Sequence, residues 1–254
     1  MRIYFIAILL LFDVIFSEAQ ISTEEIKKYN IHKITEKSFV GDSLTEMTSS
    51  YFDKQGNIYK ETSGSLTKNI TNTYENDRLK KVINYAYNGK EEQTTEYFYS
   101  SDSSYMTIST EKNFGAKNYS WHKPNGDIIK GTGVDTFFYK YDDQGKLIYI
   151  VSGGNDQERK MDVIYSYNTK GQLTKVEAQQ TNNFQTTENY EYDLKGKQVK
   201  AINKTMAFGN TRISVTSYEY NEKGLLTKEI TTESEDGAKT KTTINIYEYE
   251  FYEN

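Results

Sequence analysis

The chain has 254 residues, enough for one or two domains with a buried core. With 31 basic and 36 acidic side chains its net charge is −5, which argues against a nucleic-acid partner, because such a partner requires a basic face. It has no cysteine, so disulfides, thiolate metal sites and thiol catalysis are excluded.

Residues 1–19 have the features of a secretory signal peptide. Arg2 supplies a positive charge, residues 3–16 are apolar apart from one acid, and Ser17-Glu18-Ala19 has the small-x-small pattern of a cleavage site. A membrane anchor would need about 20 apolar residues, and this run is shorter. We expect cleavage near Ala19-Gln20 and a mature protein that is secreted, periplasmic or in the outer envelope, with no transmembrane helix.

Residues 20–44 are expected to form a cap of one helix and one strand ahead of the repeats. Ser22 and Glu25 have the spacing of a capping box, which predicts a short helix over residues 23–29. We expect this helix to cover the exposed edge of the first strand, because an uncovered edge invites aggregation.

Residues 45–254 repeat one phrase with small changes, and this repetition decides the fold. The phrase consists of aromatic-x-aromatic, Asp or Asn, two variable residues, Gly, one further residue and an aliphatic residue. The clear copies are YKYDDQGKLIYIV (139–151), YSYNTKGQLTKVE (165–177), YEYDLKGKQVKAI (190–202) and YEYNEKGLLTKEI (218–230), and the weaker ones are YFDKQGNIYKE (51–61) and WHKPNGDIIK (121–130).

Each part of the phrase has a structural role. Alternation along a strand places both aromatic side chains on one face. The Asp or Asn can bond the backbone two residues on and start a turn, and the Gly supplies the positive φ of a short hairpin loop. Further turn signals, such as Phe208-Gly209-Asn210 and Glu235-Asp236-Gly237, lie between the copies. The sequence therefore predicts an all-β fold, an antiparallel meander of β-hairpin repeats with about 14 strands that forms a large curved sheet.

The phrases YDDQGKLIYI, YNTKGQLTKV, YDLKGKQVKA and YNEKGLLTKE resemble the YD repeat, also called the RHS repeat. The resemblance covers roughly residues 45–251 and is strong from residue 135 on. It implies an all-β repeat array in an exported protein, and carbohydrate binding is often proposed for such arrays. Long members enclose a toxin, a role that this chain has too few repeats to share. The Ala-Gln cleavage site and the composition resemble those of secreted Bacteroidetes proteins.

The chemistry-bearing residues predict no enzyme. His32 and His122 lie in different segments, and we expect surface or partly packed residues rather than a catalytic or metal pair. The turn acids Asp53 and Asp142-Asp143 lack the alternating spacing and the closing Glu of a calcium loop. We therefore expect no cofactor and no metal. A glycan hydrolase with paired carboxylates in a groove of the sheet is kept as an alternative.

Two sets of aromatic residues are candidates for ligand binding. The Tyr-x-Tyr pairs would form a ladder on one face, which is a binding platform if exposed and a core if buried. Trp121, the single tryptophan, is an isolated candidate. The tyrosines are Tyr139, Tyr141, Tyr165, Tyr167, Tyr190, Tyr192, Tyr218 and Tyr220.

Taken together, these patterns predict an exported, non-enzymatic binding or scaffold module at the cell envelope or outside the cell. Its partner would be an unidentified glycan or protein, and carbohydrate is one candidate ligand. An outer-membrane-associated β-barrel is a second alternative, because strands of about ten residues with aromatic side chains suit one. Charged side chains such as Lys175 and Glu177 would, however, interrupt its lipid-facing band.

Overall fold

The computed structural model describes residues 21–252, apart from 77, 87, 102–103, 113–114, 125–126, 133–135, 153–160 and 181–183. The expected signal peptide and its cleavage site lie outside the described residues. Among the described residues, one short helix, α2 (Thr23–Lys28), precedes eighteen strands. The strands are β1 (Ile31–Val40), β2 (Ser43–Phe52), β3 (Ile58–Ser63), β4 (Leu66–Glu75), β5 (Arg78–Tyr85), β6 (Glu91–Tyr99), β7 (Tyr105–Glu111), β8 (Lys117–His122), β9 (Ile128–Thr132), β10 (Thr136–Tyr141), β11 (Leu147–Ser152), β12 (Met161–Tyr167), β13 (Leu173–Gln180), β14 (Phe184–Tyr192), β15 (Gln198–Ala207), β16 (Asn210–Tyr220), β17 (Leu226–Glu235) and β18 (Ala238–Phe251).

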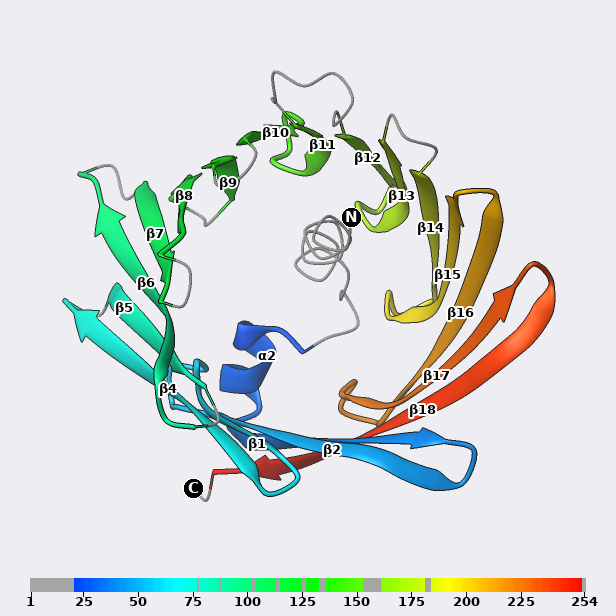
Figure 1. The fold of residues 1–254 in the computed structure, drawn as a ribbon, viewed down its shortest axis with the longest axis horizontal. Coiled ribbons are helices and arrows are strands. Elements are labelled where there is room, and N and C mark those ends of the chain that lie inside the picture. Colours follow the sequence, from blue (N-terminus) through cyan, green and yellow to red (C-terminus); the bar gives the residue numbers. More distant parts are fainter. Residues whose placement is uncertain are drawn as a thin grey trace.

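The strands form one closed antiparallel barrel (Figure 1). Each strand pairs with the next along the chain, and β18 pairs with β1 over nine residue pairs from Ile31↔Phe251 to Val40↔Thr243. The all-β class and the antiparallel meander are therefore confirmed. The open curved sheet and the count of about 14 strands are wrong, because the sheet curls until its first and last strands meet, which removes both edges.

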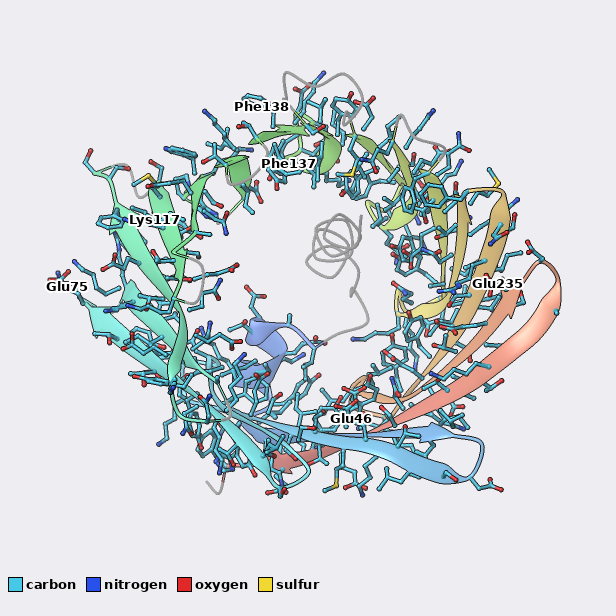
Figure 2. The ribbon with its side chains drawn as sticks, in the orientation of Figure 1. Glu46, Glu75, Lys117, Phe137, Phe138 and Glu235 are labelled. Atoms are coloured by element: carbon cyan, nitrogen blue, oxygen red, sulfur yellow. The ribbon has the colours of Figure 1, made fainter. Side chains whose placement is uncertain are left out.

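The inner and outer faces of the wall follow from two neighbouring residues on β10. Phe137 points into the ring of strands, and Phe138 points away from it (Figure 2). Directly opposite residues on adjacent strands lie on the same face, and residues two apart along a strand do so as well. The strand register therefore assigns the other wall positions to the inner or the outer face.

The predicted turns form as the phrase requires. In the turn after β12, the Oδ1 atom of Asn168 accepts hydrogen bonds from the backbone N–H groups of Lys170 and Gln172, both at 3.0 Å. Gly171 has φ of 83°, a conformation that costs glycine little and other residues much more. The two-residue loop between β15 and β16 has positive φ at both Phe208 and Gly209, as the twist of a tight hairpin demands.

The predicted N-terminal helix is confirmed, including its capping box. The backbone N–H of Glu25 donates to Ser22 Oγ at 3.1 Å, and the Ser22 N–H donates to Glu25 Oε2 at 3.2 Å. Its expected position is wrong: α2 lies within the ring (Figure 1), and β1 has no free edge to cover because it pairs with β2 and β18. In the described part of the chain, no helix is long and apolar enough to cross a membrane.

Two hydrophobic clusters stabilise the wall. The larger one covers the inner face from β11 to β15, around the buried side chains of Ile150, Val163 and Val176. The smaller one anchors α2, because Ile26 packs with Ile31, Phe52 and Leu225, all of them at most 5% exposed. Burial of these side chains stabilises the barrel on its inner side, while the outer side meets its surroundings.

Candidate functional site

The eight candidate tyrosines all lie on the inner face of β10, β12, β14 and β16, two on each strand. The first tyrosine of each pair packs against or within the larger cluster, and Tyr165 and Tyr190 are only 5% and 8% exposed. Burial raises the pKa of Tyr165 well above its usual range. The hydroxyl of Tyr165 is buried without a hydrogen-bond partner, so the packing of its ring accounts for its contribution to stability.

The second tyrosine of each pair joins two neighbouring hairpins by a hydrogen bond. Its hydroxyl donates to a backbone carbonyl of the preceding hairpin, and Tyr220, for example, bonds Gln198 O at 2.8 Å. Burial raises the pKa of Tyr220 to about 12, so the hydroxyl keeps its proton at neutral pH. The same bond recurs as Tyr99–Leu79 O, Tyr141–Ile128 O, Tyr167–Leu147 O, Tyr192–Leu173 O and Tyr249–Leu226 O, at 2.6–2.9 Å.

The strand register explains why side-chain hydrogen bonds join neighbouring hairpins at this end of the barrel. Neighbouring hairpins part near the end of the barrel that carries the Asp/Asn-x-x-Gly turns. The pairing of β15 with β16 stops at Lys200↔Ser217, although β15 begins at Gln198 and β16 continues to Tyr220. The Tyr220 hydroxyl reaches across this gap and satisfies a carbonyl that the ladder leaves without a strand partner. We call these hydroxyl-to-carbonyl contacts the seam bonds.

Trp121 lies on the opposite face from the tyrosines. It stands on β8 directly opposite Lys130, which in turn is opposite the outward-pointing Phe138. The Lys130 ammonium lies 5.1 Å from the centroid of the Trp121 ring. The structure therefore does not bring Trp121 together with the eight tyrosines, and the proposal that any of the nine binds a ligand stays a prediction.

Buried carboxylates, which the sequence did not single out, lie on the inner wall. Burial raises the pKa of Glu188 on β14 to about 7. Burial, together with the neighbouring Glu229 carboxylate, also raises the pKa of Glu36, and the Tyr247 hydroxyl lies 3.4 Å from Glu36 Oε1. Glu36 and Glu229 are therefore close enough to influence each other, and the hydrolase alternative stays a prediction.

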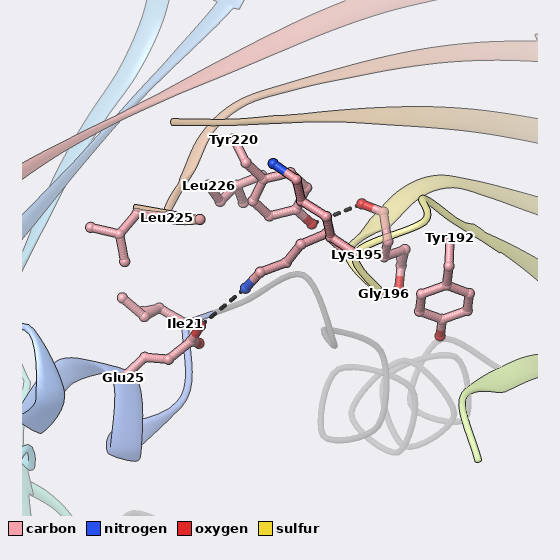
Figure 3. A pocket seen from close by; sticks show the side chains of 11 residues that line it. Ile21, Glu25, Tyr192, Lys195, Gly196, Tyr220, Leu225 and Leu226 are labelled. Atoms are coloured by element: carbon pink, nitrogen blue, oxygen red, sulfur yellow. Dashed lines mark hydrogen bonds and ion pairs between the residues drawn. The ribbon is translucent and has the colours of Figure 1, made fainter. Parts of the chain in front are cut away.

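A pocket of about 260 Å³ lies between α2 and the turns after β14 and β16 (Figure 3). Lys197 Nζ and Glu25 Oε1 form an ion pair of 3.1 Å across it, and Leu225 and Leu226 contribute apolar surface. The Tyr29 hydroxyl donates to Lys223 O at 2.9 Å beside it. The Glu25–Lys197 ion pair links α2 to the turn after β14, and Lys195 adds a second positive charge to the lining.

The two histidines lie on different strands, as expected. His122 stacks on Tyr105 with ring centroids 4.4 Å apart, and His32 packs against Tyr252 with centroids 4.8 Å apart. Among the described residues, no three His, Asp or Glu side chains are grouped so that they could hold a metal ion.

Comparison with known proteins gives fold-level likenesses only. No family model matches the chain, and neither does any curated protein. A porin-like protein from Bacteroides uniformis has 14% identity and a TM-score of 0.46, with 87% of this chain and 98% of that chain covered. A Tc holotoxin pore of Photorhabdus luminescens has 12% identity and a TM-score of 0.28, with 87% and 17% covered, and TcdB2-TccC3-TEV has 13% and 0.28, with 85% and 17% covered. These likenesses assign neither a family nor an activity.

Sequence reasoning missed the seam bonds and the inner glutamates. A signal for the seam bonds is present in the four clear copies of the phrase, because the second tyrosine stands directly before the turn and the accepting carbonyl lies near the start of the preceding return strand. The glutamates carry no such signal, because Glu188 and Glu229 occupy different positions relative to their turns.

Proposed function

We propose that the chain is an exported, non-enzymatic β-barrel of the cell envelope that stands in water and acts as a rigid binding or scaffold module. The resemblance of its phrases to the YD repeat supports an exported repeat scaffold. The observation that carries the proposal is the charge on the outer face of the barrel, at positions away from the strand ends.

Outward charges occur where a membrane-spanning barrel would meet the hydrocarbon core. Lys37 on β1, Glu177 on β13 and Lys204 on β15 all lie on the outer face by register. In lipid, a lysine at the bilayer midplane of such a barrel costs about 2–4 kcal/mol. On β14 all the outward residues, Gln185, Thr187, Asn189 and Glu191, are polar or charged, so water suits this face better than lipid does.

The inner face supports the scaffold role. The seam bonds and the packed first tyrosines hold adjacent hairpins together, and α2 is held against the inner wall by the Glu25–Lys197 ion pair. The tyrosine hydroxyls of the seam are occupied by carbonyls of the barrel itself. A ligand that uses these hydroxyls would therefore have to replace carbonyls of the barrel itself.

A second candidate is a barrel that spans the outer membrane. It is favoured by the closed ring of eighteen strands, and by the tight Asp/Asn-x-x-Gly turns that share one end of the barrel with α2 and Tyr252. Outer-membrane barrels have an even number of strands and short turns at one end.

Cell fractionation distinguishes the two candidates. The full chain is expressed in a Gram-negative host, and the cells are lysed without detergent. We expect the protein in the high-speed supernatant, monodisperse in buffer and with the circular dichroism of a β-protein. Recovery only from the membrane pellet, with extraction only by detergent, would refute the proposed function and support the second candidate.

A further inference from the structure

A row of four aromatic or apolar side chains and one lysine crosses the outer face from β6 to β10. We call it the outer row, and it consists of Phe98, Met106, Trp121, Lys130 and Phe138. Each member stands directly opposite the next on the neighbouring strand. Four strand spacings of about 4.8 Å give a row about 19 Å long. The row is a continuous surface built by the register and not a chance scatter of exposed residues.

The outer row is open to its surroundings at both ends. Phe98 and Phe138 are 47% and 46% exposed, and Ile129, which sits at the bulge between β8 and β9, is 46% exposed. The Lys130 ammonium lies 5.1 Å from the Trp121 ring centroid and 5.8 Å from that of Phe138. A cation is thus held between two aromatic rings.

The charge around the row is positive. Lys117 and Lys140 also point outward from β8 and β10, and both are exposed. All residues of β8, β9 and β10 are described, and their outward positions hold Lys, Tyr, Trp, Thr and Phe but no acid and no side-chain amide. Glu96 and Asp162 flank the row on β6 and β12, and the Tyr149 hydroxyl donates to Asp162.

We propose that the outer row is a contact site for an anionic lipid surface. Trp, Tyr and Phe rings with neighbouring lysines suit the boundary between headgroups and acyl chains, because the rings enter the apolar layer while the ammonium groups stay with the anionic headgroups. Lysines near such a surface add attraction to it. This inference rests on the proposed function, since only a barrel that stands in water has an outer face that is free to touch a membrane surface from outside.

The same observations disfavour a glycan on this row. Sugar hydroxyls are bound by acids and amides beside an aromatic ring, and the outward positions of β8, β9 and β10 hold neither. A pocket lined by Phe98, Glu75 and Arg78 lies at one end of the row, and the outer wall of the closed barrel along the rest of the row is convex. A convex strip with protruding apolar side chains fits a flat and deformable partner better.

The single tryptophan makes the test direct, because the intrinsic tryptophan fluorescence of the protein reports on Trp121 alone. The detergent-free protein is titrated with vesicles of equal parts phosphatidylcholine and phosphatidylglycerol, and with vesicles of phosphatidylcholine alone. We expect a blue shift and co-sedimentation with the anionic vesicles. Both should weaken as the salt rises to about 0.5 M, where the screening length falls to about 4 Å.

Variants assign the contact to the outer row. The double variant Phe98→Ser with Phe138→Ser removes the exposed rings but keeps the fluorescent reporter, and Lys130→Gln removes the central charge. We expect the double variant to bind at least about tenfold more weakly, because both side chains lose their apolar burial. The matched control is Lys204→Gln with Met206→Ser on the outer face of β15, which should bind like the unaltered protein. Circular dichroism confirms that each variant is folded.

Each contrary outcome has a distinct meaning. A soluble barrel that ignores anionic vesicles overturns this inference and leaves the proposed function intact. Equal losses in the outer-row and β15 variants overturn it as well, because the contact would then not be local. A blue shift with soluble polygalacturonate but not with vesicles replaces the lipid with an acidic glycan. A protein extracted only by detergent overturns both the inference and the proposed function.

Discussion

Removal of a single seam bond tests the role of the second tyrosines. Tyr220→Phe deletes the hydroxyl that donates to Gln198 O at 2.8 Å and keeps the ring in place. Tyr165→Phe is the matched control, because it deletes a hydroxyl that is buried without a hydrogen-bond partner. The two substitutions remove the same atom from the same face of the barrel, and they differ in whether a bond is lost.

The expected magnitude follows from the surroundings of the two hydroxyls. A net hydrogen bond contributes about 0.5–1.5 kcal/mol to the free energy of unfolding, and Tyr220→Phe also leaves the Gln198 carbonyl without its donor. For a chain of this size, a loss of 1 kcal/mol lowers Tm by about 2–4 °C. Tyr165→Phe should leave the free energy of unfolding unchanged or raise it, because the hydroxyl it removes was desolvated without compensation.

Urea unfolding followed by circular dichroism, with a thermal scan as a second measure, gives both values. The slope of the unfolding curve should be the same in all three proteins, so that a change of midpoint reports stability. Equal losses in the two variants, or a larger loss for Tyr165→Phe, would show that the seam bonds do not stabilise the barrel.

Three further changes test other parts of the structure. Gly171→Ala places a side chain at φ of 83° and should cost about 1 kcal/mol or more, whereas Gly131→Ala, where the added Cβ would lie 3.9 Å from its nearest neighbour, should be near neutral in the same urea assay. Burial raises the pKa of Glu188 to about 7, so between about pH 4 and pH 7 the folded state holds a proton that the unfolded state has lost. The stability from this group is therefore present at low pH and is lost as pH rises through 7. Glu188→Gln should raise stability at pH 8 and flatten this part of the pH profile, and an unchanged profile would contradict the assignment. Glu25→Gln keeps a capping residue but removes the charge paired with Lys197, so amide exchange in α2 should speed up while exchange in the strands stays the same.

Local structure was predictable because each local feature has a local cause. The Asp/Asn-x-x-Gly turns form around side-chain bonds such as those of Asn168, and the capping box of α2 forms between Ser22 and Glu25. The alternation that places Tyr165 and Tyr167 on one face is a property of any strand. These features depend on residues at most four positions apart.

Closure was not predictable in the same way, because it depends on how curvature accumulates over eighteen strands. No short pattern near Ile31 indicates that it pairs with Phe251. The strand count predicted from turn signals is too low, because some turns in the first half of the chain, such as the one between β1 and β2, carry no copy of the phrase. The position expected for α2, over the edge of the first strand, is wrong for the same reason, since a closed barrel has no edge for a helix to cover.

Closure also sets the order in which the barrel must assemble. Hairpins such as β16–β17 need only short loops, whereas pairing β1 with β18 brings together residues roughly 220 positions apart, which costs about 3 kcal/mol more in chain entropy than closing a loop of about ten residues. Before that step β1 and β18 are edge strands, and each has unpaired backbone N–H and C=O groups along one side. The first edge carries Lys33 and Lys37 outward, and the last carries Glu248 and Glu250. Two first edges from different molecules repel each other, as do two last edges, while the first and last edges of one chain attract. The charges on β1 and β18 therefore favour closure of the ring over pairing between like edges of two chains.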